Sequence, residues 1–543
     1  MTILAGMVTV STRRGALAGL ELTGGAAVFR GIRYAEPPVG GLRWAPPVAV
    51  AAWSGVRRAE DFGAACLQAR YPPDSIYTQQ PRRMSEDCLF LNVWRPPEAA
   101  NAPVMVWLHG GALRRGDPAS GLYDGEQLAR RGVVVVTVNY RLGVLGYFAH
   151  PRLSAESPHA SSGNYGLLDQ IEALRWVRDD IAAFGGDPGN VTLFGESAGA
   201  LSAIELMTSP LARGLFHKVI LQSGYLVSNP ELKRPRFGQS SAESMGEWLA
   251  QVSGFEDVAA LRALPAESLV ALAAAAGFDP QATIDGWVLP RQIVESLDRG
   301  EQAAVPMIVG FNEGEVRALR PTFLPPLPQS AAEYESRVRA IYQDLAPRYL
   351  ACYPAADIEE SALAAARDAF YGWSAERLAR AQTRLGVPAH LYFFAHDYPA
   401  QRARHLEAFH ASELPYEFGR IGTREGWPEL WPRPPDDSRE HTLSEAIMGY
   451  FTSFARDSVP MAPAAPAWRP YQDDRAYLEF RDTPRPGHHL LPGRFELHEE
   501  VVARRRAAGT QPWYVNVGLA SPAVPPPAVS HVARIEDNGG ADE

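Results

Sequence analysis

The sequence predicts an α/β fold with a large, mostly parallel central sheet, and three observations lead to it. Valine-rich runs at 103–109 and 133–138 have the apolar character of strands that are buried on both faces. A helical pattern covers 166–184, and another short apolar strand follows at 191–194. Strands and helices that alternate in this way place helices against both faces of a parallel sheet.

The individual elements follow in order along the chain. A glycine-rich loop and a polar helical stretch near Glu126 to Arg131 separate the first two strands. The next helix carries apolar side chains at helical spacing, and these are Leu167, Ile171, Leu174, Val177 and Ile181. The segment 185–190 (GGDPGN) ends that helix. Later strands are predicted at 305–310 and 390–395.

Composition restricts the class of protein. Hydrophobic residues make up 46% of the 543 residues and charged residues 21%, which is typical of globular proteins and excludes disordered, collagen-like and disulfide-scaffold chains. A net charge of −10, from 52 basic and 62 acidic side chains, disfavours nucleic acid and anionic membranes as partners. The longest apolar run, 133–148, contains Asn139 and Arg141 and is too polar to span a bilayer.

The strongest chemical motif is GESAG at 195–199, which lies between the strand at 191–194 and a helical run. The G-x-S-x-G pattern in this context predicts a nucleophile elbow, in which Ser197 projects its hydroxyl above the sheet. Gly195 and Gly199 leave room for the tight turn, and the N-terminal amides of the next helix point to the same place. A simple turn serine is the alternative, but the strand–turn–helix context favours a nucleophile.

A second motif can supply hydrogen-bond donors. The segment HGGA (109–112) directly follows a predicted strand, and its glycines allow backbone N–H groups to approach a substrate. The amides of Gly111, Ala112 and Ala198 can therefore form an oxyanion hole for acyl transfer. An ordinary glycine turn is the alternative; it is weakened because both loops follow strands at the same sheet edge.

The chain resembles the type-B carboxylesterases, which include cholinesterases and bacterial para-nitrobenzyl esterases, over roughly residues 7 to 515. The resemblance rests on the segments 29–47, 85–96, 109–112, 139–148, 163–188, 194–200 and 221–224. It implies an α/β-hydrolase fold with long helical insertions that border an active-site gorge. It also implies hydrolysis of a small-molecule ester by a Ser–Glu–His triad without metal or cofactor.

The resemblance also suggests the other two triad members. VGFNEGE (309–315) resembles the acid segment of the family and implies Glu315, although Val316 stands where the family usually has glycine. Glu313 followed by Gly314 would satisfy an alternative register. AFHASELPYEFG (408–419) resembles the histidine loop and implies His410 as the base. Glu196 and Ser223 resemble residues that support the triad, and both could equally be structural.

The resemblance to the family also suggests the domain boundaries. One catalytic domain is expected over 1–518, with helical insertions at about 230–300 and 320–385. The proline-rich segment 519–543 is predicted to be a poorly ordered tail.

The cysteines leave the cellular compartment open. Cys66 and Cys88 match two cysteines that usually form a loop disulfide in the family, and the alternative is two buried thiols. The absence of a visible signal peptide favours the cytoplasm, whereas a removed signal and an oxidised pair would indicate the periplasm or secretion. No cysteine or histidine spacing indicates a metal site.

Two departures from the family bear on the substrate. Thr78, next to Tyr77, replaces the tryptophan of choline-selective members, so a cation–π cage is not expected. Arg114 and Arg115 follow the glycine motif and can bind a carboxylate, which suggests anionic or polycarboxylate esters. Arginines in salt bridges or solvent are the alternative.

Other functions on the same scaffold remain as alternatives to ester hydrolysis. A non-catalytic interaction protein would typically lose the nucleophile or its partners, whereas Ser197, Glu315 and His410 are all present. Hydrolysis of amide, carbamate or lactone bonds would use the same triad. The sequence gives no indication of the oligomeric state.

Overall fold

A sheet of thirteen strands runs through the described part of the chain, which in this computed structural model comprises residues 4–81, 83–255, 257–472, 474–513 and 517–527. The main path of the sheet is β1 (Leu4–Ser11), β2 (Ala16–Leu22), β3 (Ala27–Arg33), β7 (Phe90–Arg95), β9 (Val134–Val138), β8 (Ala102–Leu108), β10 (Gly186–Glu196), β11 (Lys218–Gln222), β12 (Met307–Asn312), β13 (Ala389–Phe394), β14 (Ala476–Phe480) and β15 (Pro484–His488). Strand β4 (Val56–Arg58) pairs with β2, and β5 (Ala65–Cys66) and β6 (Met84–Ser85) form a separate pair.

The seven strands from β9 to β14 along this path are parallel, and the strands toward both edges are antiparallel. The predicted strands correspond to β8, β9, β10, β12 and β13. Strand β10 begins earlier than expected, because Gly186 already pairs with Ala102 before the register shifts ahead of Val191. The predicted α/β fold with a mostly parallel sheet is thus confirmed.

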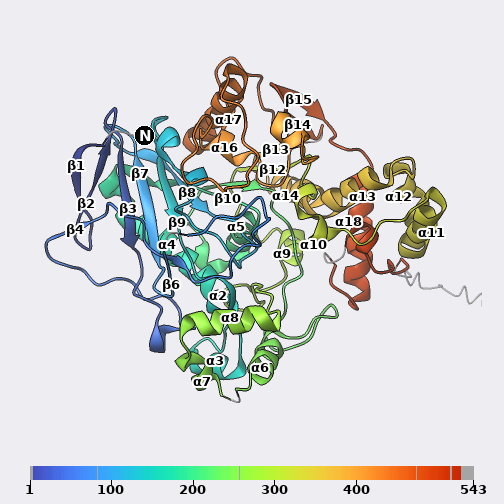
Figure 1. The fold of residues 1–543 in the computed structure, drawn as a ribbon, viewed down its shortest axis with the longest axis horizontal. Coiled ribbons are helices and arrows are strands. Elements are labelled where there is room, and N and C mark those ends of the chain that lie inside the picture. Colours follow the sequence, from blue (N-terminus) through green and yellow to red (C-terminus); the bar gives the residue numbers. More distant parts are fainter. Residues whose placement is uncertain (1–3, 82, 256, 473, 514–516, 528–543) are drawn as a thin grey trace, which may run out of the picture.

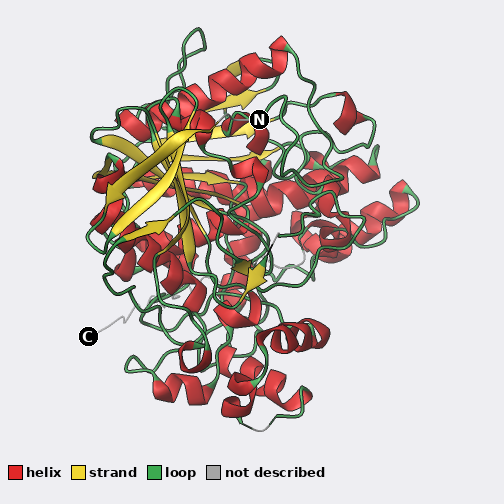
Figure 2. Ribbon diagram, turned by 60° about the vertical axis from the view of Figure 1, so that its left-hand side comes forward, coloured by secondary structure: helices red, strands yellow, loops and turns green. Residues whose placement is uncertain are grey.

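Both faces of the central strands are buried, as their apolar runs predict. Val104 and Val106 of β8 belong to one apolar cluster, and Met105 and Trp107 belong to a second cluster on the opposite face. The first face packs against α4 (Tyr165–Asp180), α5 (Ala198–Thr208) and α14 (Trp373–Arg384), and the second against α16 (Leu414–Glu417) and α17 (Ser438–Asp457). Figure 2 shows the strands as one layer with helices on both sides.

The predicted helix at 166–184 consists of α4 and a 3-10 turn over Ile181–Phe184. Gly185 ends it in the left-handed conformation, with φ at 81°. The remaining short helices of the first half are α1 (Glu126–Ala129), α2 (Gly143–Tyr147) and α3 (Pro151–Glu156). Helix α5 starts directly after Ser197, so the sheet and its covering helix meet at the predicted nucleophile.

Two groups of helices extend beyond the sheet (Figure 1). The first is α6 (Ala242–Val252), α7 (Val258–Ala263), α8 (Ala266–Ala276) and α9 (Ile293–Arg299), within the insertion predicted at about 230–300. The second is α10 (Arg320–Phe323), α11 (Ala331–Tyr342), α12 (Ala346–Cys352) and α13 (Ile358–Arg367), next to α18 (Arg494–Ala508). A short helix, α15 (Pro399–Arg402), precedes the His410 loop.

The start of the predicted tail packs against the second helical group. Leu519 and Val524 are buried with apolar residues of α11 and α12, and the Val524 N–H donates to the Ile341 carbonyl at 2.7 Å. The packed segment therefore extends past the expected boundary at 518, because apolar side chains among the prolines find a groove between helices. Residues 528–543 of the predicted tail lie outside the described residues.

Helix α5 also carries a fully buried acid, Glu205. The Asn229 side-chain amide donates to Glu205 Oε1 at 3.0 Å. Burial raises the pKa of Glu205 to about 8, because one neutral donor does not offset the loss of water around a carboxylate. The folded protein thus retains a proton that the unfolded chain loses near its ordinary carboxyl pKa.

We expect Glu205 to make the protein less stable as pH rises. Because the pKa of Glu205 is raised in the folded state, its stabilising contribution to the free energy of unfolding is complete below the unfolded-state pKa. Between the unfolded-state and folded-state pKa values, this contribution falls by about 1.4 kcal/mol per pH unit. Glu205→Gln removes this dependence, so its free energy of unfolding should fall less than that of the wild type between pH 5 and 8. Denaturant unfolding at a series of pH values measures this, with Glu267→Gln on the exposed face of α8 as control. Parallel losses in wild type and Glu205→Gln would contradict the raised pKa.

Candidate active site

The turn at Ser197 is strained in the manner of a nucleophile elbow. Ser197 has φ at 56° and ψ at −122°, between the end of β10 and the start of α5. A Cβ at Gly199 would lie 1.9 Å from the Leu108 carbonyl oxygen, and one at Gly195 would lie 2.7 Å from the same atom. Both glycines of the motif are therefore required by close approach of β8 to the turn.

His410 lies on the loop between β13 and α16 and contacts the predicted acid. Its Nδ1 is 2.5 Å from Glu315 Oε2. The other carboxyl oxygen of Glu315 accepts the Asn312 N–H at 2.8 Å, which ties the acid to the end of β12. Glu315 is fully buried, so both oxygens are fixed by these contacts.

The alternative acid, Glu313, points elsewhere. Its Oε1 forms an ion pair with Arg481 at 3.0 Å, and its side chain is partly exposed. Of the two possible registers of the acid segment, this structure has the one that places Glu315, and not Glu313, next to His410.

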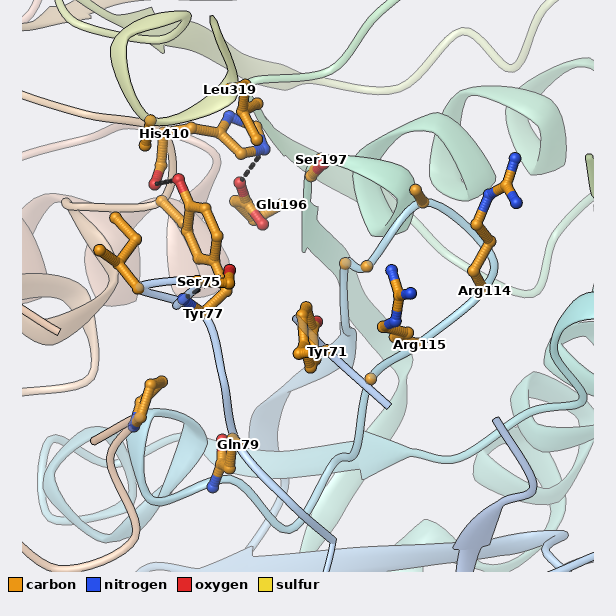
Figure 3. A pocket seen from close by; sticks show the side chains of 18 of the residues that line it. Tyr71, Ser75, Tyr77, Gln79, Arg114, Arg115, Glu196, Ser197, Leu319 and His410 are labelled. Atoms are coloured by element: carbon orange, nitrogen blue, oxygen red, sulfur yellow. Dashed lines mark hydrogen bonds and ion pairs between the residues drawn. The ribbon is translucent and has the colours of Figure 1, made fainter. Parts of the chain in front are cut away.

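Glu196 contacts the opposite edge of the imidazole. Its Oε1 lies 3.0 Å from His410 Nε2 (Figure 3). Because Glu315 contacts Nδ1, His410 stands between two carboxylates. Burial alone would lower the pKa of His410, but the charges of Glu196 and Glu315 outweigh burial and hold this pKa well above its usual value. The sequence suggested Glu196 as a residue that supports the triad, but it gave no sign of this contact with His410 Nε2.

The glycine loop after β8 packs against the turn. A Cβ at Gly110 would lie 2.8 Å from Glu196 Oε2 and 3.1 Å from the Cβ of Ser197. Gly111 and Ala112 are both in left-handed conformations, with φ at 112° and 56°. Their backbone lines the same pocket as Ser197, and Ala198 provides the first amide of α5.

Ser223 lies at the end of β11, next to the turn. Its N–H donates to the Gly310 carbonyl at 2.9 Å, and its φ is 48°. The side chain is fully buried, and its hydroxyl has no hydrogen-bond partner among the described residues. The structure therefore brings Ser223 near the site without a contact to Glu196 or His410.

These residues open into a cavity of about 990 Å³. Aromatic side chains form one wall, and these are Tyr225, Phe323, Phe370 and Tyr371. Phe370 and Tyr371 lie on a π-helical segment, Asp368–Gly372, a geometry that often occurs at functional sites. The Tyr371 ring centroid is 5.3 Å from that of His410.

Tyr77 is a further contact that the sequence did not indicate. Its hydroxyl donates to the His410 carbonyl oxygen at 3.0 Å, and its ring faces His410 edge-on. The segment between Cys66 and Cys88 thus reaches the loop that carries His410.

Both predicted arginines line the cavity, in different surroundings. Arg114 pairs with Asp279 at 2.5 Å and also donates to the Phe278 carbonyl. Arg115 donates through Nε to the Ala69 carbonyl, and its guanidinium lies 5.1 Å from the Tyr71 ring centroid. Figure 3 shows the Arg115 side chain near Tyr71, on the same side of the pocket as the glycine loop.

Cys66 and Cys88 are buried and free in this structure. The adjacent Cys66 thiol, with burial, holds the pKa of the Cys88 thiol well above its ordinary value. Within the described ranges, no group of three or more histidine, cysteine or carboxylate side chains could hold a metal. No described helix has the length and apolar character needed to cross a bilayer.

Comparison with known proteins agrees with this geometry. Residues 6–497 match the model of the carboxylesterase family. The chain is 38% identical over 432 residues to a fumonisin B1 esterase of Sphingopyxis macrogoltabida, covering 76% of this chain and 75% of that protein. It is 34% identical over 541 residues to a cocaine esterase of Oryctolagus cuniculus, covering 91% of this chain and 94% of that protein.

Solved structures give the same result. A PNB esterase superposes with a TM-score of 0.77 at 32% identity, covering 90% of this chain and 99% of that one. A Geobacillus stearothermophilus carboxylesterase superposes with a TM-score of 0.74 at 31% identity, covering 92% of this chain and 99% of that one. The chain belongs to the carboxylesterase family and is a carboxylic ester hydrolase with the α/β-hydrolase fold.

Proposed function

We propose that this enzyme hydrolyses esters through a covalent acyl-enzyme on Ser197, with His410 as general base and Glu315 as its orienting acid. The observation that carries the proposal is the contact of Glu315 with His410 Nδ1, together with the strained turn at Ser197, because His410 and Ser197 line the same cavity. A bound ester would place its carbonyl between Ser197 and the amides of Gly111, Ala112 and Ala198.

The steps follow from these positions. Ser197 Oγ attacks the carbonyl carbon while His410 Nε2 accepts the hydroxyl proton. The carbonyl oxygen becomes an oxyanion and accepts hydrogen bonds from the three amides. The tetrahedral intermediate collapses, the C–O bond to the alcohol breaks, and His410 returns the proton to the leaving alkoxide. Water then repeats the sequence on the acyl-enzyme and releases the acid.

Glu196 has a separate role in this proposal. In the free enzyme it holds His410 Nε2 at 3.0 Å, which favours the protonated imidazole. A protonated imidazole cannot accept the Ser197 proton, so its loss must precede attack. The contact supports Glu196 as the residue that sets the pH at which the base becomes competent.

The finer substrate preference concerns Arg115. We infer that its guanidinium binds a carboxylate of the ester, because no described carboxylate lies within ion-pair distance of it, whereas Arg114 is engaged by Asp279. Asp74 and Asp117 also line the cavity, and their charges oppose an anion, so Arg115 would have to hold it. Such a contact would favour anionic or polycarboxylate esters.

The triad assignment makes a direct prediction. Ser197→Ala should lower kcat on the order of 10⁶-fold, as for other triad nucleophiles. Glu315→Gln should lower kcat on the order of 10⁴-fold, because the imidazole loses the partner that orients it. Steady-state kinetics with a chromogenic ester measure both.

Glu313→Gln is the matched control, since Glu313 pairs with Arg481 and should leave kcat close to that of the wild type. If Glu313→Gln lost activity and Glu315→Gln kept it, the acid would be misassigned. Matched ester, amide, carbamate and lactone substrates identify the bond that is cleaved.

The pH dependence of kcat/KM tests the two carboxylates around His410. The raised pKa of His410 should place the acidic limb above pH 6.5, the ordinary histidine value, since only the neutral imidazole is a base. Glu196→Gln removes one charge that stabilises the imidazolium and should move this limb to lower pH. Glu313→Gln should leave the limb in place. An unmoved limb in Glu196→Gln would show that Glu196 does not control the base.

Substrate preference is tested with two esters of one alcohol, one with a neutral acyl chain and one of equal length that ends in a carboxylate. We expect a higher kcat/KM for the anionic ester. Arg115→Gln should reduce this preference by about tenfold or more, the effect of about 1.4 kcal/mol from a charged hydrogen bond. Arg114→Gln, whose guanidinium is already paired with Asp279, is the control. Equal turnover of the two esters by the wild type would rule the preference out.

A further inference from the structure

A row of paired residues crosses four parallel strands near their carboxyl ends. Glu196 of β10 pairs with Gln222 of β11, Gln222 with Gly310 of β12, and Gly310 with Tyr392 of β13. Two residues earlier on the first three strands, the same face carries the buried side chains Phe194, Ile220 and Ile308. The row is thus the polar end of an otherwise apolar face that α16 and α17 cover.

Two glutamates from the His410 loop pack onto this row. Glu417 ends α16, and its Oε2 accepts a hydrogen bond from the Gln222 side-chain amide. Glu413 directly precedes α16, and its Oε2 accepts one from the Asn312 side-chain amide. Glu417 is 1% exposed and Glu413 is 3% exposed, so water cannot solvate either carboxyl group from outside.

The Glu417–Gln222 and Glu413–Asn312 pairs leave the same kinds of oxygen atom without a hydrogen-bond partner among the described residues. Among the described residues, the second carboxyl oxygen of each glutamate and the amide oxygen of its partner make no hydrogen bond. The Glu205–Asn229 pair in the core has the same pattern. A buried carboxylate needs several donors to replace water, whereas Glu417 has one neutral donor, the Gln222 amide. A proton on the carboxyl group supplies the missing donor, and acid and amide can then pair through both of their polar atoms.

We propose that Glu417 is a neutral carboxylic acid in the resting enzyme and that its pair with the Gln222 amide positions the nucleophile turn. The link to the turn is direct, because the backbone carbonyl of Gln222 accepts the Ser197 N–H at 2.9 Å. Glu417 thereby acts through Gln222 on the backbone that carries Ser197. This inference rests on the proposed role of Ser197 as nucleophile.

The surroundings of Glu417 keep it neutral. Glu196 faces it from β10 and Glu413 from its own loop, while Tyr392 of β13 and Tyr123 lie within electrostatic reach. Burial, with the neighbouring Glu413, raises the pKa of Glu417 well above its usual range. Burial also holds the pKa values of both tyrosines well above normal, so neither supplies a charge. Ionisation of Glu417 would remove its donor and add a charge that repels Glu196.

The protonation state is tested by infrared spectroscopy, which detects the C=O stretch of a protonated carboxylic acid. Wild-type enzyme at neutral pH should show this band, and Glu417→Gln should lose part of it. Glu205→Gln and Glu413→Gln provide matched comparisons in the other two pairs. An unchanged band in Glu417→Gln would overturn the proposal, and this readout does not depend on whether Ser197 is the nucleophile.

The positioning role is tested by the alkaline limb of kcat/KM. Above the pKa of Glu417, wild-type activity should fall with rising pH until it reaches the level of Glu417→Leu. Glu417→Gln keeps an amide in the pair and cannot ionise, so its limb should move to higher pH, with kcat/KM at neutral pH within about twofold of wild type. Glu417→Leu, which breaks the pair, should lower kcat by about tenfold or more with little change in KM.

Each outcome bears on the proposal. The positioning role would be overturned if the alkaline limb stayed in place in Glu417→Gln. It would also be overturned if Glu417→Gln lost as much activity at neutral pH as Glu417→Leu. If Glu417→Leu fails to fold, the infrared band and the limb of Glu417→Gln still decide the question. Labelling of Ser197 by an organophosphonate tests the proposed nucleophile separately.

Discussion

The imidazole of His410 lies between two buried carboxylates, and much of the surrounding structure serves to hold this arrangement. Glu315 reaches Nδ1 from the end of β12, and Glu196 reaches Nε2 from the end of β10. A buried charge is costly unless it is paired, so the histidine and the two acids depend on one another. The Asn312 amide and the Tyr77 hydroxyl fix the loops that carry them.

The parallel sheet makes this meeting of distant residues possible. Parallel strands end at the same edge, so side chains far apart in sequence arrive together at their carboxyl ends. Burial of both faces of β8 and its neighbours keeps that edge rigid. Within this frame, Glu417 can remain buried at the site as the neutral acid that we propose.

The sequence predicted much of this site because its signals are local. The Ser197 turn and the glycine loop are defined by short motifs, and the strands before them by continuous apolar runs. The antiparallel strands β1–β3 were not predicted, because their half-buried patterns are weaker than those of the central strands. The bulged start of β10 was also missed, since pairing of Gly186 with Ala102 overrides the turn residues there.

Other features depend on pairs that are distant in sequence. Asp279 engages Arg114 across more than one hundred and sixty residues, and the Tyr77 contact to His410 spans a still longer separation. Whether Glu313 or Glu315 faces His410 depends on where Arg481 lies. Periodicity and motif spacing carry no information about such partners, because the fold alone brings them together.

The close approach of the glycines has a mechanical consequence. Gly199 abuts the Leu108 carbonyl and Gly110 abuts Ser197, so the Ser197 turn and the glycine loop pack closely against each other. Phe323 lies at the end of α10 and Phe370 on the π-helical segment that follows α13, so the aromatic wall comes from different parts of the chain. Those parts can be reshaped without altering the packing of the Ser197 turn against the glycine loop. Substrate range and bond-breaking chemistry can therefore diverge independently in this architecture.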